Sequence, residues 1–148
     1  MFFLPQAVAA WIVSIWAIEW RRLRDLLPYG LLGHAMCSTE DYLGGRIGWW
    51  EYRDTGPFPS HVDVSTIISL SAAPLLAMYF VQGLGPGERV PWARIAGVTA
   101  FSLIPEAVGL LTGHVRHGNG WNFGISVLVY FLNWLVFLAL HRWLDRAQ

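Results

Sequence analysis

A single acidic residue inside a long apolar stretch constrains this chain more than any other feature. The residues from Ile95 to Gly113 form an apolar run long enough to cross a bilayer, and Glu106 lies near its middle. A charged side chain at that depth costs about 2.5 kcal/mol or more, so such residues usually face the interior of a helix bundle. The run therefore predicts a membrane helix that turns Glu106 away from lipid.

The composition agrees with a membrane protein. Of the 148 residues 55% are hydrophobic and 14% are charged, whereas soluble domains average about 25% charged residues. The nine Trp residues suit the headgroup zone, where an apolar ring and a polar N–H are both satisfied. The formal net charge is zero, so nothing points to nucleic acid. We expect one all-α domain, residues 1–148, with the lipid bilayer as its surroundings.

Five helices are expected to span the bilayer. Their predicted ranges are Leu4–Trp20, Tyr29–Gly45, Val64–Gln82, Ile95–Gly113 and Trp121–His141. Pro28 is expected to separate the first two helices, and Pro74 is expected to kink the third. No basic residue precedes the first apolar stretch and three Arg follow it, which is the reverse of a secretory signal. We therefore expect a retained first span.

The arginines predict the orientation, because every basic residue of the chain is an Arg. With five alternating spans, seven Arg fall on one side and three on the other; the first set is Arg21, Arg22, Arg24, Arg89, Arg94, Arg142 and Arg146, and the second is Arg46, Arg53 and Arg116. Cytoplasmic loops carry the excess of basic residues. The pattern predicts a multi-pass protein of the cytoplasmic membrane with its N-terminus outside and its C-terminus inside.

The second helix leaves two alternatives open. His34, Ser38 and Asp41 lie at i, i+4 and i+7 and therefore share one face. A spanning helix would turn this face toward the other helices, whereas a short interfacial helix would turn it toward water. We favour the spanning helix because it keeps the distribution of arginines consistent.

Polar residues on the later helices predict a polar interior around Glu106. Ser102 lies on the same face of the fourth helix as Glu106. The fifth helix carries Asn122 and Ser126 on one side, with Tyr130 near them. Three interpretations fit these residues together with Asp41: a hydrogen-bond network that fixes helix packing, a site for a ligand, ion or proton, and a catalytic site.

Two more specific chemistries were weighed. His61, Asp63, His114 and His117 would lie on the outer face and suit Zn²⁺, but their spacing matches no helical two-His motif, so neither a metal nor another cofactor is expected. Asp41 and Glu106 form a possible acid–base pair, one carboxyl staying neutral in its apolar site, able to protonate an isoprenoid olefin. Pro105-Glu106 resembles the Pro-x-Glu signature of small membrane lycopene cyclases, although Ala107 stands where that signature has a second acidic residue.

The order of several motifs resembles a family of small, uncharacterised bacterial membrane proteins that is common in spore-forming Firmicutes. The matching features are Asp41-Tyr42, Trp49-Trp50-Glu51-Tyr52, Pro57-Phe58-Pro59, the helix with Pro74, the loop with Trp92, Ser102 to Glu106, and Trp121-Asn122 through Ser126 to Tyr130. Glu40 is an alternative to Asp41 for the acidic position. The resemblance implies a multi-pass fold and adds weight to Glu106 and Trp121, and it implies no activity.

Two functions are predicted from these residues. The first is a binding, scaffold or transport-like role toward a cation, a proton or a small polar ligand, without catalysis. Its candidate ligand-binding residues are Glu106, Asp41, Ser102, Trp121, Asn122, Ser126, Tyr130 and His34. The alternative is a membrane enzyme that acts on a lipid or isoprenoid, with Glu106 as general acid and Asp41 as its partner.

Overall fold

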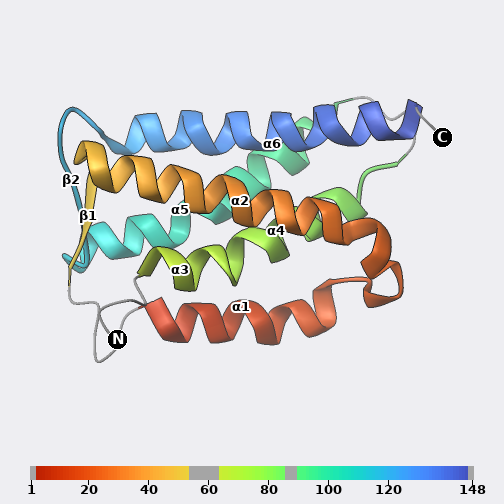
Figure 1. The fold of residues 1–148 in the computed structure, drawn as a ribbon, viewed down its shortest axis with the longest axis horizontal. Helices are drawn as coiled ribbons and strands as arrows, with labels where there is room; N and C mark the ends of the chain where they lie inside the picture. The colour runs from red at the N-terminus through yellow and green to blue at the C-terminus, as the bar shows by residue number, and fades with distance from the viewer. Residues whose placement is uncertain (1–2, 54–63, 86–89, 147–148) are drawn as a thin grey trace.

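The computed structural model describes residues 3–53, 64–85 and 90–146, and most of them are helical (Figure 1). The elements are α1 (Phe3–Ala17), the 3₁₀ helix η1 (Trp20–Arg22), α2 (Leu23–Ile47), β1 (Trp50–Tyr52), α3 (Val64–Ser69), α4 (Ala72–Gln82), α5 (Trp92–Leu111), β2 (Val115–His117) and α6 (Phe123–Arg146). The predicted loops around residues 50 and 116 thus contain two short strands.

The helices run up and down along one axis, with α3 and α4 together making one pass (Figure 1). α2 packs on α3 and α4, α1 packs on the same pair, and α5 packs on α6. The two strands lie at one end of the bundle, which we call the sheet end. η1, with Arg21 and Arg22, and the last turns of α6 lie at the opposite end, which we call the arginine end.

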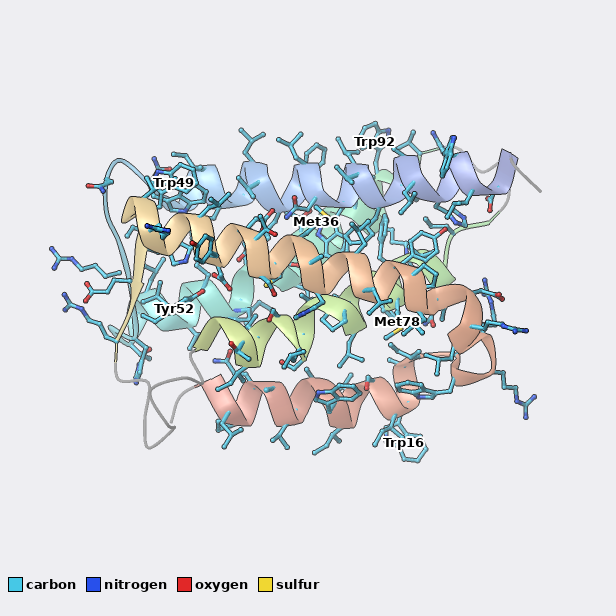
Figure 2. The ribbon with its side chains drawn as sticks, viewed as in Figure 1. Trp16, Met36, Trp49, Tyr52, Met78 and Trp92 are labelled. Carbon is cyan, nitrogen blue, oxygen red and sulfur yellow. The ribbon has the colours of Figure 1, made fainter. Side chains whose placement is uncertain are left out.

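Two helices, α5 and α6, are long and apolar enough to cross a membrane. Only 28% and 22% of their apolar windows are buried inside the protein, so most of their apolar surface faces outward. The shorter stretches Leu4–Ala17 and Thr66–Gln82 are also apolar. Trp16 of α1 points away from the bundle and is 87% exposed (Figure 2). Apolar surface on this scale is unusual for a monomer in water.

The prolines act differently from one another. The prediction that Pro28 separates two helices was wrong, because α2 begins at Leu23 and continues through it. A proline this near the N-terminus removes one hydrogen bond without ending the helix. Pro74 does more than kink its helix: α3 ends at Ser69 and α4 begins at Ala72. A proline ring clashes with the carbonyl four residues earlier, here Leu70, which lies in this break.

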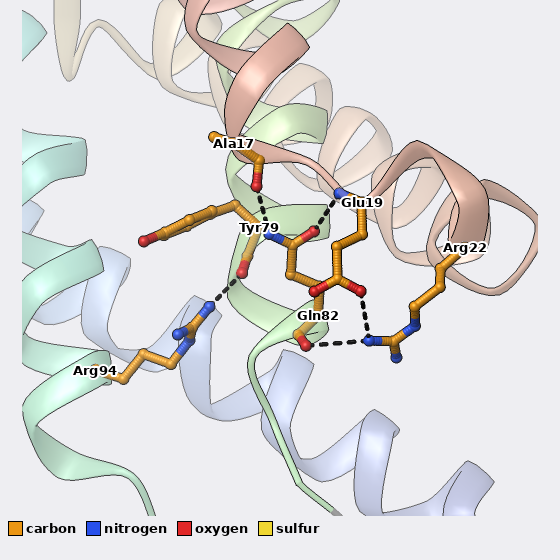
Figure 3. A network of polar contacts seen from close by, with 6 residues as sticks. All are labelled: Ala17, Glu19, Arg22, Tyr79, Gln82 and Arg94. Carbon is orange, nitrogen blue, oxygen red and sulfur yellow. Dashed lines mark hydrogen bonds and ion pairs between the residues drawn. The ribbon is translucent and has the colours of Figure 1, made fainter.

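Backbone groups freed at the arginine end are bound by side chains (Figure 3). Gln82 donates from Nε2 to the carbonyl of Ala17 over 2.6 Å and accepts from the Glu19 N–H over 2.9 Å. Arg94 donates to the carbonyls of Tyr79 and Phe80 near the end of α4. These bonds satisfy helix-terminal carbonyls and tie α1 and α5 to α4.

The arginine end also holds the apolar core. Its largest fully buried side chains are Phe80, Leu26 and Ile95. The rings of Phe80 and Trp134 lie 5.1 Å apart. α2 approaches α4 closely at Gly33, where a Cβ would lie 3.0 Å from both the Ala73 carbonyl oxygen and the Ala77 Cβ. Small residues at such a crossing let two helices pack in lipid, where no hydrophobic force joins them.

The sheet end is closed by β1 and β2, which pair antiparallel with Trp50 opposite His117 and Tyr52 opposite Val115. Gly48 ends α2 with φ of 76°, a left-handed conformation that glycine adopts without steric cost. The chain then turns back into β1. The pairing joins segments more than sixty residues apart and places both strands across the ends of α2, α5 and α6 (Figure 1).

Candidate functional site: an acidic cavity at the sheet end

A cavity of about 190 Å³ lies between α2, α4, α5 and α6 beneath the sheet. Three carboxyl side chains line it: Glu40 and Asp41 from α2 and Glu106 from α5. No Lys or Arg is among the described lining residues, and His117 is the one imidazole there. Its other polar side chains are Cys37, Trp50, Tyr52, Ser102, Trp121, Ser126, Tyr130, Asn133 and Trp134.

Glu106 is held by two donors from different elements. Its Oε1 accepts a hydrogen bond from Ser126 Oγ of α6 over 2.5 Å and lies 2.9 Å from Nε2 of His117 of β2. Ser126 Oγ in turn accepts from the Trp121 indole N–H over 2.8 Å. The Glu106 and His117 side chains are 12% and 15% exposed. Glu106, around which a polar interior was predicted, thus links α5 to α6 and to the sheet.

Asp41 is tied to the other strand. The Tyr52 hydroxyl of β1 donates to Asp41 Oδ1 over 2.7 Å. Burial raises the pKa of the Tyr52 phenol well above its usual range, and the Asp41 carboxylate beside it raises that pKa further. The phenol therefore stays protonated at physiological pH and remains a hydrogen-bond donor to Asp41.

Glu40, the neighbour of Asp41, lines the same cavity and forms a hydrogen bond with α6. Its Oε1 accepts from Asn133 Nδ2 of α6 over 2.8 Å. Tyr130 of α6 also lines the cavity, and its hydroxyl makes no hydrogen bond with the described residues. Glu40 thus joins Asp41 in the cavity instead of replacing it, and the Tyr130 hydroxyl is available to a ligand.

Three tryptophans cluster at the sheet end, and two of them, Trp50 and Trp121, line the cavity. The Trp121 ring lies 4.8 Å from the rings of both Trp49 and Trp50. The Trp50 ring packs on Gly44 of α2, where an added Cβ would lie 2.2 Å from it. Tyr52 also lines the cavity.

The structure brings together most of the predicted site residues. Glu106, Asp41, Ser102, Trp121, Ser126 and Tyr130 all line the cavity. Asn122 does not, because α6 begins at Phe123 and the Asn122 side chain accepts from the Ile125 N–H at the helix start. His34 lies outside the cavity as well, with Nδ1 at 3.0 Å from the Ser69 carbonyl, where it connects α2 to α3.

The predicted histidine group on the outer face is divided. His117 contacts Glu106, whereas His114 Nδ1 lies 2.8 Å from the Thr112 hydroxyl. His61 and Asp63 lie outside the described residues. Within residues 3–53, 64–85 and 90–146 no group of three or more His, Cys, Asp or Glu side chains is arranged to hold a metal ion.

Sequence reasoning missed the roles of Tyr52 and His117 as partners of the two acids. Both lie on short strands whose pairing joins distant segments, and three residues are too few for an alternating pattern to indicate a strand. The position of Asn133, eleven residues after Asn122 on the predicted inner side of its helix, was the available signal for its contact with Glu40.

Comparison of the chain with models of protein families, with curated proteins and with solved structures gives no match. The resemblance to the family of small membrane proteins from Firmicutes therefore stays a prediction.

Proposed function

We propose that this chain is a multi-pass membrane protein whose acidic cavity binds a cationic or hydrogen-bond-donating group. The observation that carries the proposal is the lining of the cavity: three carboxyls around about 190 Å³ of space, with no Lys or Arg among the described residues. Ionised carboxylates around one buried space repel one another, and among the described lining residues only His117 can carry a positive charge. A bound cation or donor would offset that repulsion.

A packing role alone accounts less well for this arrangement. A hydrogen-bond network that only holds helices together needs no open space. These side chains surround a cavity, and the Tyr130 hydroxyl has no hydrogen-bond partner among the described residues. Polar contacts between membrane helices contribute on average only about 0.6 kcal/mol each. Three acids in one cavity are a costly way to obtain so little stability, and ligand binding explains why they are together.

The membrane setting rests on the outward-facing apolar surface of α5 and α6 and on the arginines. The end of the bundle that holds η1 is the predicted cytoplasmic end, because six of the ten Arg lie there among the described residues. The acidic cavity would then lie toward the outer face, beneath the sheet. Five spans, an outside N-terminus and a place in the cytoplasmic membrane of a bacterium all belong to this proposal.

The test is native mass spectrometry of the protein released gently from its own membrane. We expect a co-purifying small molecule that is lost from Glu106→Gln, which keeps the shape of the side chain but removes its charge. Glu19→Gln is the matched control, since Glu19 lies at the arginine end and pairs with exposed Arg22. The same bound mass in all three proteins, or none in any, would contradict the proposal.

A second candidate, an acid–base enzyme acting on a lipid or isoprenoid, is favoured by one observation: Asp41 and Glu106 line the same cavity. General acid catalysis requires such a carboxyl within hydrogen-bonding reach of the substrate. The same experiment separates the two functions. An enzyme would retain a different molecule, its unreacted substrate, in Glu106→Gln, whereas a binding protein would lose its ligand.

A further inference from the structure

An apolar cleft of about 670 Å³ lies next to the acidic cavity, between α1, the α3–α4 pair and α5. It lies within the range of about 300–1,000 Å³ that is usual for ligand pockets. On α1 it extends from Gln6 to Ala17, a helix length of about 16 Å. Val13, Phe101 and Ile104 line it and are more than half exposed, so the cleft is open at its rim.

The cleft and the cavity share one wall. The same side chains line both spaces: Ile68, Ala72, Leu76, Phe101 and Pro105. The cleft on one side of this wall has an apolar lining, and Arg94 is the one charged side chain among its described residues. The guanidinium of Arg94 is already bonded to the carbonyl of Tyr79 (Figure 3) and to that of Phe80 at the arginine end. The cavity on the other side of the wall is lined by the three carboxyls.

We propose that the ligand of the acidic cavity is a single-chain amphiphile. Its cationic head group lies among Glu40, Asp41 and Glu106, and its hydrocarbon chain passes Phe101 into the cleft beside α1. This inference rests on the proposed function and names the ligand class. Two observations carry it: the apolar space adjoins the acidic space across shared side chains, and the carboxyls of the described lining complement an amine and disfavour an acid.

Substitutions in the cleft can block the hydrocarbon chain of the ligand without altering the head-group site. Gly97 of α5 lines the cleft, and an added Cβ there meets no atom within 4 Å. Gly97→Phe therefore fills the cleft without a clash at its own position. Gly45 of α2 is the matched control, because its added Cβ also meets nothing within 4 Å and it lines neither space. Val13→Trp fills the cleft from the opposite wall.

The experiment uses a hexadecylamine that carries a photoreactive group in its chain, with the protein in nanodiscs of phosphatidylcholine. A hexadecanoic acid with the same photoreactive chain is the comparison probe. We expect the amine to label α1 and α5, and labelling to fall about tenfold in Gly97→Phe, Val13→Trp and Glu106→Gln. Gly45→Phe should be labelled by the amine as strongly as the unsubstituted protein, and the acid probe should label the protein only weakly.

Three results would overturn the inference, and they differ in what they leave standing. Labelling that requires Glu106 but survives both cleft variants would keep the head-group site and remove the chain from the cleft. Equal labelling by the amine and the acid, lost only when the cleft is filled, would leave an apolar cleft that does not select a head group. Labelling that no variant changes would contradict the proposed function as well.

Discussion

The two ends of this bundle are built from the same helices but differ in their interiors. The arginine end is filled by apolar side chains such as Phe80, Leu26 and Ile95, none of which is more than 1% exposed. The sheet end is hollow and acidic, with Glu40, Asp41 and Glu106 around a cavity. Figure 2 shows Met78 toward the first end and Tyr52 at the second.

The difference indicates a division of roles along the bundle axis. The arginine end is closely packed with apolar side chains, which stabilise the fold. The sheet end keeps carboxyls and open space that reduce stability, a cost that the proposed binding role would account for. Substitutions at the two ends should therefore separate stability from ligand binding.

The largest loss of stability is expected from Phe80→Ala in the filled end. Phe80 is 0% exposed and its ring lies 5.1 Å from that of Trp134. Emptying such a site costs roughly 3–5 kcal/mol. Unfolding of the purified protein in detergent measures the loss, and native mass spectrometry should show the ligand still bound. A loss smaller than that of any cavity variant would break the comparison between the ends.

A smaller loss of stability is expected where Trp50 packs on α2. Gly44→Ala places a Cβ 2.2 Å from the Trp50 ring, and overpacking of this kind costs about 1–3 kcal/mol. Its neighbour provides the control, since a Cβ at Gly45 meets nothing within 4 Å. Gly45→Ala should be neutral or slightly stabilising in the same unfolding measurement. Equal effects of the two substitutions would mean that Trp50 does not pack on α2.

The smallest change in stability is expected at the acid itself. In Glu106→Gln the amide oxygen still accepts from Ser126 and His117, so the melting temperature should change little. Glu106→Leu leaves both of these partners without an acceptor, which costs about 1–3 kcal/mol for a buried group. If Gln destabilises the protein as much as Leu in thermal unfolding, the charge of Glu106 is needed for folding and the division of roles is wrong.

The helical class and much of the cavity lining followed from local patterns. Glu106 and Ser102 share a face of α5, and Ser126 lies on the matching face of α6; all three line the cavity. This reasoning failed at Asn122 because helical spacing has meaning only inside a helix, and α6 begins one residue later. Pro28 was misjudged because the effect of a proline depends on its distance from the helix start, which the sequence does not show.

The two strands could not be predicted from the sequence, for a different reason. β1 and β2 have three residues each and are held by pairing with each other. No local preference reveals a contact between Tyr52 and Val115, which are distant in sequence. Because His117 and Tyr52 reach the acids only through this pairing, their roles at the site could not be predicted from the sequence.

The central claim is that the three carboxyls lie within the membrane and are reached from lipid. The most direct test is labelling of the protein in intact membranes with dicyclohexylcarbodiimide, an apolar reagent that modifies protonated carboxyls, in parallel with a water-soluble carbodiimide. We predict that the apolar reagent modifies Glu40, Asp41 or Glu106, and that the water-soluble reagent modifies Glu51, which is exposed on β1. Modification of the cavity carboxyls by the water-soluble reagent as fast as Glu51, or by neither reagent, would contradict the account.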